Sequence, residues 1–212
     1  MRRSELVRRL GAVPAPARPR ADREQVVTPP EAAAELLLAA LAEGNLAGRR
    51  VADLGSGTGR LAIGAALLGA APVEGIEIDP TLVEVARATA RRARVRVEFA
   101  AGDVASWHGP AEVVIMNPPF GAQRRHADRP FWDAALAGPG RSIYGFALTS
   151  ARAFVLARLA DAGALVAWTR SIPWSLPRVF AHHTRARADL GVDLWAVRTP
   201  RASRAAALPT TP

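Results

Sequence analysis

Cysteine and lysine are both absent from this 212-residue chain. Without cysteine the chain has no disulfide, no iron–sulfur cluster and no thiolate zinc site. It also has no thiol nucleophile, which excludes the covalent route for methylating carbon 5 of pyrimidines. All 28 basic residues are arginine, and we interpret this as a compositional bias toward arginine and alanine rather than as selection for guanidinium chemistry.

Long uncharged apolar runs are missing as well. Arginine or an acid interrupts every hydrophobic stretch before it reaches the roughly 20 residues needed to cross a bilayer. Arg8 and Arg9 follow the first residues too closely to leave room for the apolar region of a secretion signal. With 50% hydrophobic and 22% charged residues, the chain is predicted to be one cytoplasmic globular domain that has no membrane partner.

The positive charge, +9 in total, is concentrated at the two ends of the chain. Residues 1–24 carry 7 arginines and 3 acids, and residues 120–212 carry 13 arginines and 5 acids. Residues 25–119 carry 8 arginines and 11 acids. This distribution predicts that the two ends meet a polyanion such as a nucleic acid, while the middle has a different task.

Composition and the pattern of apolar residues divide the chain into three parts. Residues 1–24 read as a basic extension and a proline-rich linker, residues 25–200 as the main domain, and residues 201–212 as a disordered tail. Thr28 to Glu31 resembles a helix capping box with proline at the first helical position, which predicts a helix over about 29–43.

Beyond residue 50, short apolar runs alternate with helical stretches. This βαβ alternation predicts an α/β fold with a mostly parallel sheet and helices on both faces. The expected strands are 51–54, 73–78, 95–99, 111–116, 142–146, 164–169 and 191–198, and the expected helices are 58–69, 80–93, 130–137 and 149–161.

A glycine-rich turn follows the first expected strand, in Asp53-Leu54-Gly55-Ser56-Gly57-Thr58-Gly59. Glycines let the backbone approach a ligand and present its N–H groups. The turn does not match the dinucleotide-binding fingerprint G-x-G-x-x-G, because Arg60 stands at the position of the third glycine. An acid two residues before the first glycine suits a ligand with a cationic amine, such as the amino-acid end of S-adenosylmethionine.

Two further acids stand where the next strands end. Glu77 is placed to accept hydrogen bonds from ribose hydroxyls, and Asp103 to accept the exocyclic amine of adenine. Asp79 directly precedes a proline, and we interpret it as a helix N-cap rather than a ligand contact. The carboxyl ends of parallel strands share one edge of a sheet, so the series Asp53, Glu77 and Asp103 indicates a cofactor site more strongly than any member alone.

The fourth expected strand ends in Asn117-Pro118-Pro119-Phe120. The two prolines remove backbone donors, which leaves nearby carbonyls available as acceptors. The Asn117 side-chain oxygen and the Pro118 carbonyl can then accept both hydrogens of one planar NH2 group, and Phe120 can stack on the ring that bears it. Drawing these hydrogens out of plane localises the lone pair toward a methyl donor, so positioning and electrostatics suffice for the reaction.

These residues resemble the class I S-adenosylmethionine-dependent methyltransferases that act on amino nitrogens, whose signature is [DNS]-P-P-[YF]. A closer resemblance, to the methyltransferase-like-five family, runs through Glu24-Gln25, Thr28-Pro29, the glycine-rich turn and Met116 to Phe131, and continues in Leu176-Pro177, Phe180, His183 and Val192 to Leu194. It implies a Rossmann-like class I methyltransferase fold with a seven-stranded sheet and an N-terminal helical extension. It also implies an N6-adenine methyltransferase of small-subunit ribosomal RNA. The cofactor-binding residues that it implies are Gln25, Thr28, Asp53, Gly55, Gly57, Gly59, Glu77, Asp103, Val104 and Asn117, with Asn117, Pro118, Pro119 and Phe120 catalytic.

The chain departs from that family at two places. The residue after Gln25 is Val26 where the family has tyrosine, and the family's Tyr-Ser-x-His appears as Tyr144 to Ala147 without the histidine. Eukaryotic members of the family work with a small zinc-containing activator subunit, which the resemblance adds as a candidate partner.

A flipped adenine entering such a pocket would bring RNA phosphates to its rim. One basic segment directly follows the catalytic turn and another precedes the last expected strand. The histidines of the second segment lack nearby acid or cysteine partners, so no metal site is predicted. The RNA-binding candidates are Arg124, Arg125, His126, Arg129, His183, Arg185 and Arg187, and Asp128 is expected to cap the helix after the first segment.

Three other functions stay open at this point. A glutamine-N5 protein methyltransferase of the release-factor type shares Asn-Pro-Pro-aromatic, because an amide NH2 poses the same geometric problem. A DNA N6-adenine methyltransferase is less favoured, because a chain of 212 residues leaves no room for a separate target-recognition domain. A catalytically silent RNA-binding factor is disfavoured by the intact Asn117 and the three cofactor acids.

Overall fold

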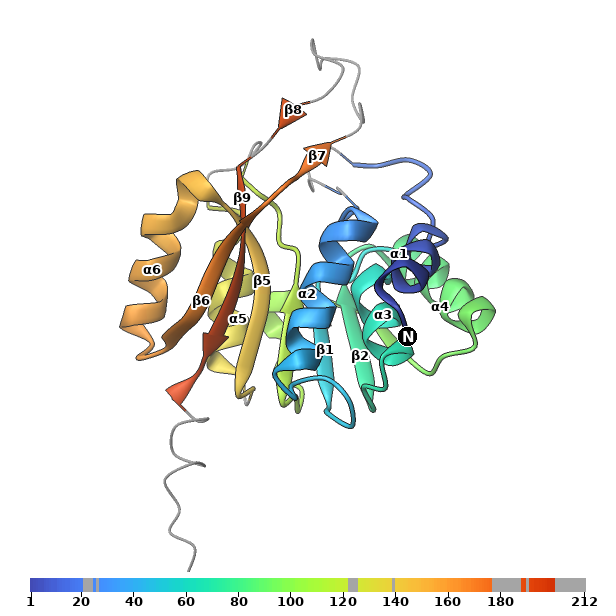
Figure 1. The fold of residues 1–212 in the computed structure, drawn as a ribbon, viewed down its shortest axis with the longest axis horizontal. Helices are drawn as coiled ribbons and strands as arrows, with labels where there is room; N and C mark the ends of the chain where they lie inside the picture. The colour runs from blue at the N-terminus through green and yellow to red at the C-terminus, as the bar shows by residue number, and fades with distance from the viewer. Residues whose placement is uncertain are drawn as a thin grey trace, which may run out of the picture.

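A computed structural model describes residues 1–20, 25, 27–121, 126–138, 140–176, 188–189 and 191–200. The central sheet has seven strands in the order β3-β2-β1-β4-β5-β9-β6 (Figure 1). Neighbouring strands from β3 to β5 pair in parallel, while β9 runs antiparallel to both β5 and β6. The predicted mostly parallel, seven-stranded α/β sheet is confirmed.

The strands are short and, apart from a small two-stranded pair, belong to this one sheet. Their bounds are β1 Val51–Leu54, β2 Val73–Glu77, β3 Glu98–Ala101, β4 Val113–Met116, β5 Ser142–Leu148, β6 Leu165–Ile172 and β9 Val192–Arg198, with β7 Ser175–Leu176 and β8 Ala188–Asp189 forming the separate pair. The helices are α1 Arg3–Gly11, α2 Pro30–Ala42, α3 Arg60–Leu67, α4 Pro80–Ala93, α5 Arg129–Ala137 and α6 Arg152–Asp161, and the 3₁₀ turns are η2 Val104–Ser106 and η3 Thr149–Ala151.

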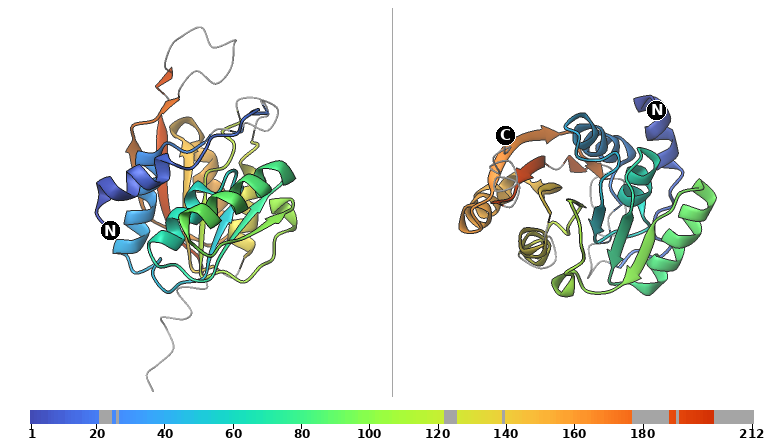
Figure 2. Two further views of the ribbon diagram at one scale, coloured as in Figure 1. Left: turned by 90° about the vertical axis from the view of Figure 1, so that its right-hand side faces the viewer. Right: turned by 90° about the horizontal axis from the view of Figure 1, so that it is seen from below.

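Helices cover both faces of the sheet, as the end-on view of Figure 2 shows. The alternation of side chains along β4 creates the two layers: Val113 and Ile115 pack with the core formed by α1 to α4, while Val114 and Met116 pack with α5 and α6. All four residues of β4 are buried, which is typical of a central parallel strand covered on both faces.

The N-terminal helix α1 is part of the first layer, because Leu6 and Leu10 are fully buried against α2 and α3. The chain then passes through the N-terminal linker, which we define as residues 12–29, to reach the start of α2. Figures 1 and 2 show that the described part of this linker rises toward the end of the sheet at which β1 and β4 terminate.

Two of the predicted helix caps are wrong. Helix α2 begins at Pro30 and its N-cap position is Pro29, which has no side-chain acceptor, so the Thr28 capping box does not form. Asp128 does precede α5, but its backbone is helical (φ −74°, ψ −18°) rather than extended, and its side chain makes no cap hydrogen bond.

Other element boundaries shift by two or three residues. Helix α3 starts at Arg60 rather than 58, because Gly57 and Gly59 hold left-handed backbone angles that prolong the turn. Strand β3 starts at Glu98 rather than 95. None of the helices within the described ranges is long and apolar enough to cross a membrane, and the predicted disordered tail, residues 201–212, lies outside those ranges.

Candidate active site

A pocket of about 600 Å³ opens where β1, β2, β3 and β4 end. This is the edge at which parallel α/β sheets bind ligands. The pocket brings together most of the residues that the sequence nominated, although they come from six separate segments. The nominated residues that line it are Gln25, Thr28, Asp53, Gly55, Gly57, Glu77, Asp103, Val104, Asn117, Pro119, His126 and Arg129.

The glycine-rich turn forms the floor of this pocket. Gly55 and Gly57 both have positive φ, +72° and +54°, which favours glycine. A Cβ on Gly55 would lie 2.6 Å from the Phe131 ring, so the turn also requires glycine for space. Gly59 does not line the pocket; a Cβ there would lie 2.8 Å from the Phe99 ring, which makes it a packing position under α3.

Asp53 is the most deeply buried acid of the pocket, with 1% of its surface exposed. Its Oδ2 accepts a hydrogen bond from the Ala62 backbone N–H at 2.9 Å. Its Oδ1 is buried and accepts no hydrogen bond from the part of the chain that the structure describes. Burial, with a smaller contribution from the nearby Glu77 carboxylate, raises the pKa of Asp53 to about 7. An ammonium group fits this orphaned acceptor.

Glu77 lies at the end of β2 with 6% of its surface exposed. Its Oε2 accepts from Gly57 N–H at 2.8 Å, and its Oε1 accepts from Asp79 N–H at 3.0 Å. Each carboxylate oxygen has a second lone pair, so the group can fix the glycine turn and still accept a ligand hydroxyl.

The other two acids also have structural roles. Asp79 caps α4 as predicted, since its Oδ1 accepts from Thr81 N–H at 3.0 Å, and its Oδ2 accepts from Gln25 Nε2 at 3.1 Å. Asp103 Oδ1 accepts from Ala105 N–H at 2.9 Å and so holds the start of η2. The turn-forming and ligand-binding interpretations of Asp103 are therefore compatible, because the residue also lines the pocket.

The tetrapeptide after β4 meets the pocket only in part. Asn117 and Pro119 line it, and Asn117 Oδ1 is buried. Pro118 and Phe120 are not among the lining residues. The half-buried Phe120 ring packs edge-on against Trp174 at 5.5 Å between centroids, and Trp174 packs in the same way on Phe146 at 5.0 Å.

Arg60 and Phe131 are two pocket residues that sequence reasoning did not nominate. Arg60 lines the pocket and donates to the backbone oxygens of Thr28 and Val13, at 2.5 and 2.6 Å. Desolvation lowers its pKa to about 10. Phe131, on α5, lines the pocket against Gly55. The departure from the dinucleotide fingerprint marked Arg60 as unusual, but nothing local in the sequence indicated Phe131.

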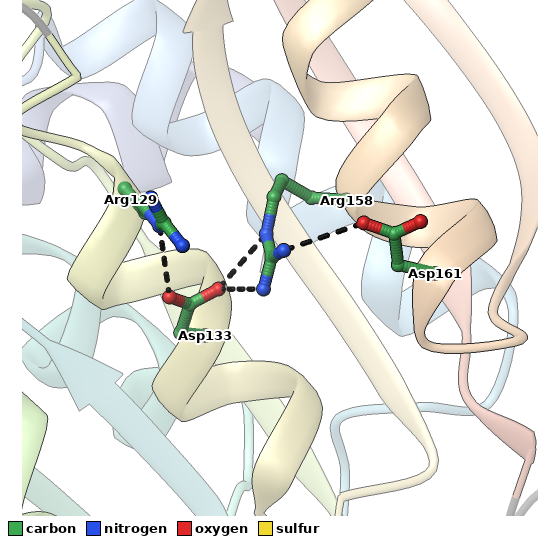
Figure 3. A network of polar contacts seen from close by, with 4 residues as sticks. All are labelled: Arg129, Asp133, Arg158 and Asp161. Carbon is green, nitrogen blue, oxygen red and sulfur yellow. Dashed lines mark hydrogen bonds and ion pairs between the residues drawn. The ribbon is translucent and has the colours of Figure 1, made fainter.

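Among the predicted RNA contacts, His126 and Arg129 lie at the pocket. The His126 ring packs on Phe154 at 4.4 Å between centroids. Figure 3 shows that Arg129 shares a network with Asp133 and Arg158, in which its Nε lies 3.4 Å from Asp133 Oδ2 while its side chain stays 58% exposed. The remaining candidates, Arg124, Arg125, His183, Arg185 and Arg187, lie outside the described residues. Within those residues, no cluster of histidines and acids is arranged to hold a metal ion.

Comparison with known proteins shows the family to which this chain belongs. The family model described as methyltransferase small domain matches residues 29–136. The protein MJ0284 of Methanocaldococcus jannaschii is 33% identical over 84% of this chain and 86% of its own length. The rRNA N(6)-adenosine-methyltransferase Mettl5 of Drosophila melanogaster is 29% identical over 81% of this chain and 84% of its own length.

A solved structure agrees with these sequence matches. The crystal structure of a Pyrococcus horikoshii protein described as an RNA methyltransferase has a TM-score of 0.87 and 34% identity, with 94% of this chain and 98% of that chain covered. The glycine turn fits the cofactor of such enzymes, as does the Asp53 oxygen, which has no hydrogen-bond partner among the described residues. The chain belongs to the methyltransferase small domain family, as an S-adenosylmethionine-dependent methyltransferase related to the METTL5 proteins.

Proposed function

We propose that this protein transfers a methyl group from S-adenosylmethionine to the N6 amine of an adenine in small-subunit ribosomal RNA, after the base has left its stack. One observation carries the proposal: Asn117 of the Asn-Pro-Pro-Phe turn opens into the same pocket as Asp53, Glu77 and Asp103. The amine acceptor and the cofactor acids thus share one pocket, as methyl transfer to an amino nitrogen requires.

The cofactor half of the proposal assigns one task to each acid. Asp53 holds the ammonium group of the methionine moiety with its free Oδ1, Glu77 binds the ribose hydroxyls, and Asp103 accepts from the adenine amine. Gln25, Thr28 and Val104 complete the walls, and Gly57 presents the backbone of the turn. When bound, S-adenosylmethionine supplies a sulfonium-activated methyl group.

The catalytic half uses hydrogen-bond acceptors in place of a strong base. Asn117 Oδ1 and the Pro118 carbonyl accept the two hydrogens of the target amine and localise its lone pair toward the methyl group. The nitrogen lone pair forms the new N–C bond while the C–S electrons stay on sulfur. The methylated amine then loses one proton to solvent. Phe120 offers an aromatic face to the flipped base, and its edge contact with Trp174 sets the angle of that face.

Two further observations favour RNA as the substrate. The METTL5 relatives are named for adenosine methylation in ribosomal RNA, and they match most of this chain. The formal charge of +9 supplies the phosphate affinity that a ribosomal substrate needs. His126 and Arg129 at the pocket are the described residues that we assign to the RNA backbone next to the flipped base, and Arg124, Arg125, His183, Arg185 and Arg187 complete the proposed interface.

The proposal also covers location and partners. We propose a cytoplasmic location, which is consistent with a ribosomal RNA substrate. A small zinc-containing activator subunit remains a candidate partner, which rests on the family resemblance and is examined in the assay below.

The test is transfer of labelled methyl groups to small-subunit ribosomal RNA, with and without a candidate activator, followed by nucleoside mass spectrometry. We expect N6-methyladenosine that disappears with Asn117→Ala and is partly retained with Asn117→Asp, which keeps an acceptor at the same position. Label in a protein fraction would instead support glutamine methylation. Absence of transfer to either substrate, together with absence of cofactor binding, would support a silent RNA-binding factor.

A further inference from the structure

A buried ion pair lies at the same edge of the sheet as the pocket, where β5 and β6 end. Asp193, the second residue of β9, is fully buried. Its Oδ2 accepts hydrogen bonds from Arg152 Nε at 3.0 Å and from Arg152 Nη2 at 2.9 Å. Its Oδ1 accepts from Ser171 Oγ at 2.7 Å and from Thr149 Oγ1 at 3.2 Å. One carboxylate therefore ties the ends of β5 and β6 to the first residue of α6.

This pair fixes the direction of one guanidinium group. A carboxylate that is buried among strands loses its hydration, and apolar side chains of similar size would avoid that penalty. What the pair adds is orientation, because two N–H donors on the same carboxylate hold the planar guanidinium at a single angle. Asp193 occupies two of the five N–H groups of Arg152, and no described residue accepts from Nη1. The side chain stays 44% exposed, so its free edge is open to another acceptor.

Arg152 lies past the level of the catalytic turn. Met116, the last residue of β4, pairs with Gly145 of β5, and β5 continues for three more residues to Leu148. At about 3.3 Å per residue, β5 therefore ends roughly 10 Å beyond β4. Figure 1 shows α6 starting at this end of β5. The first residue of α6 thus stands beyond the turn that carries Asn117.

The geometry of methyl transfer decides which side of Asn117 the target nucleotide takes. The amine attacks the methyl carbon from the side opposite sulfur, so the cofactor and the nucleotide lie on opposite sides of the methyl group. The cofactor acids come from the ends of β1, β2 and β3, whereas β5 is the other neighbour of β4. The nucleotide therefore lies toward β5 and the start of α6. A contact already joins these parts, because Phe154 of α6 packs on His126 of the pocket at 4.4 Å between ring centroids.

We propose that Arg152, oriented by Asp193, binds a phosphate of the RNA backbone beside the flipped adenine and so holds that nucleotide at Asn117. The phosphate is at the far end of a nucleotide from the base amine, which matches the position of Arg152 beyond the turn. Guanidinium groups favour phosphate because their planar N–H groups match its oxygens. The inference rests on the proposed function, since it requires an RNA substrate, and it adds a contact on α6 to those assigned to His126 and Arg129.

The main test replaces Arg152 by methionine and measures the dissociation constant for small-subunit ribosomal RNA over a range of salt concentrations. A phosphate contact to a single strand contributes roughly 0.7 to the slope of log affinity against log salt. We expect Arg152→Met to bind RNA about tenfold more weakly, with a slope shallower by roughly 0.7. The dissociation constant of S-adenosylhomocysteine should change by less than about twofold. An equal loss of cofactor affinity would show that the ion pair only supports the fold, and would overturn the proposal.

Arg49→Met is the matched control, because it removes the same charge at the opposite end of the sheet. Arg49 comes just before β1, its side chain is also 44% exposed, and its Nη1 lies 3.0 Å from Glu112 Oε1. We expect this variant to bind RNA as the unaltered protein does, with the same dependence on salt. Equal changes in the two variants would mean that Arg152 acts through net charge alone, which would contradict the assignment of a phosphate contact.

Arg152→Lys separates charge from orientation. Lysine keeps a cation beside Asp193 but lacks the planar fork, so the salt dependence should be retained while kcat for methyl transfer falls by at least about threefold. Unchanged kcat would refute the positioning role, and this measurement decides the question if Arg152→Met does not fold. Unaltered protein that transfers no methyl group to RNA would count against the proposed function, whereas an active protein in which Arg152 is dispensable would refute this inference alone.

Discussion

The pKa of Asp53 makes cofactor affinity depend on pH in a range where an ordinary aspartate would not. Burial raises the pKa of this carboxyl from 3.8 to about 7 in the protein without cofactor. The cofactor amine is a cation, and its best partner is the ionised carboxylate. At acidic pH, binding therefore has to expel the proton from Asp53 first, which weakens the apparent affinity.

The size of the effect follows from the ionised fraction. With a pKa of about 7, roughly 3% of Asp53 is ionised at pH 5.5 and roughly 76% at pH 7.5. S-adenosylhomocysteine should therefore bind about 25-fold more weakly at pH 5.5 than at pH 7.5. With an ordinary aspartate pKa near 4 the two affinities would be almost equal. The upper limit of pH 7.5 keeps the cofactor amine, with a pKa of about 8, mostly protonated.

Isothermal titration at the two pH values measures this ratio, and two controls isolate Asp53. The first is 5′-methylthioadenosine, which keeps the ribose and adenine but lacks the amino-acid end, so its affinity should be nearly constant. The second is Asp53→Asn, which cannot ionise and should bind S-adenosylhomocysteine weakly at both pH values. A ratio below about twofold for S-adenosylhomocysteine in the unaltered protein would refute the reasoning.

The same carboxyl links pH to stability. The unfolded chain loses this proton near pH 4, whereas the folded chain keeps it until about pH 7. The contribution of Asp53 to the free energy of unfolding is thus fully present below pH 4 and is lost as the pH rises through 7. A cofactor that binds the ionised form reverses this, so S-adenosylhomocysteine should raise the melting temperature more at pH 7.5 than at pH 5.5.

Three further predictions concern single substitutions. Asn117→Ala should nearly abolish methyl transfer while the dissociation constant of S-adenosylmethionine changes by less than about fivefold, and an equal loss of cofactor binding would contradict the assignment to the target amine. Glu77→Ala should instead weaken cofactor binding by at least about tenfold in titration, since it removes a charged hydrogen-bond acceptor, and unchanged affinity would count against the ribose role. Gly59→Ala should lower the free energy of unfolding by about 2–4 kcal/mol, because φ is +91° and the new methyl would meet Phe99 at 2.8 Å; thermal denaturation should show a smaller loss for Gly48→Ala, where φ is +69° and the space is open.

The sheet and the series of acids were predictable because they depend on periodic patterns and on topology. Strands that alternate with helices force parallel neighbours, and parallel neighbours bring their carboxyl ends to one edge. Asp53, Glu77 and Asp103 therefore meet in the pocket although 50 residues of sequence separate the first from the last. The comparisons show the family, while the ligand contact of each acid remains a prediction of the proposed function.

The local sequence predicted one helix cap correctly and another incorrectly. Asp79 caps α4 as expected, because its backbone is extended and the proline directly after it sets the first helical turn. Asp128 stands one residue further from its proline, adopts a helical backbone and makes no cap bond. Asp128 lies in a turn in which the Arg129 N–H donates to the His126 carbonyl at 3.1 Å, and its backbone is already helical there.

Contacts between distant segments are the part of the site that the sequence could not reveal. Arg60 was visible only as the residue that breaks a fingerprint, since its acceptor at Val13 lies 47 positions away. Phe131 looked like any apolar helix residue, yet its ring closes over Gly55 and removes the space for a side chain there. Arg60 connects the end of the glycine turn to the linker, and Phe131 packs on the turn from α5. The shape of the cofactor pocket therefore depends on the linker and on α5 as much as on the glycine-rich turn from which the pocket was predicted.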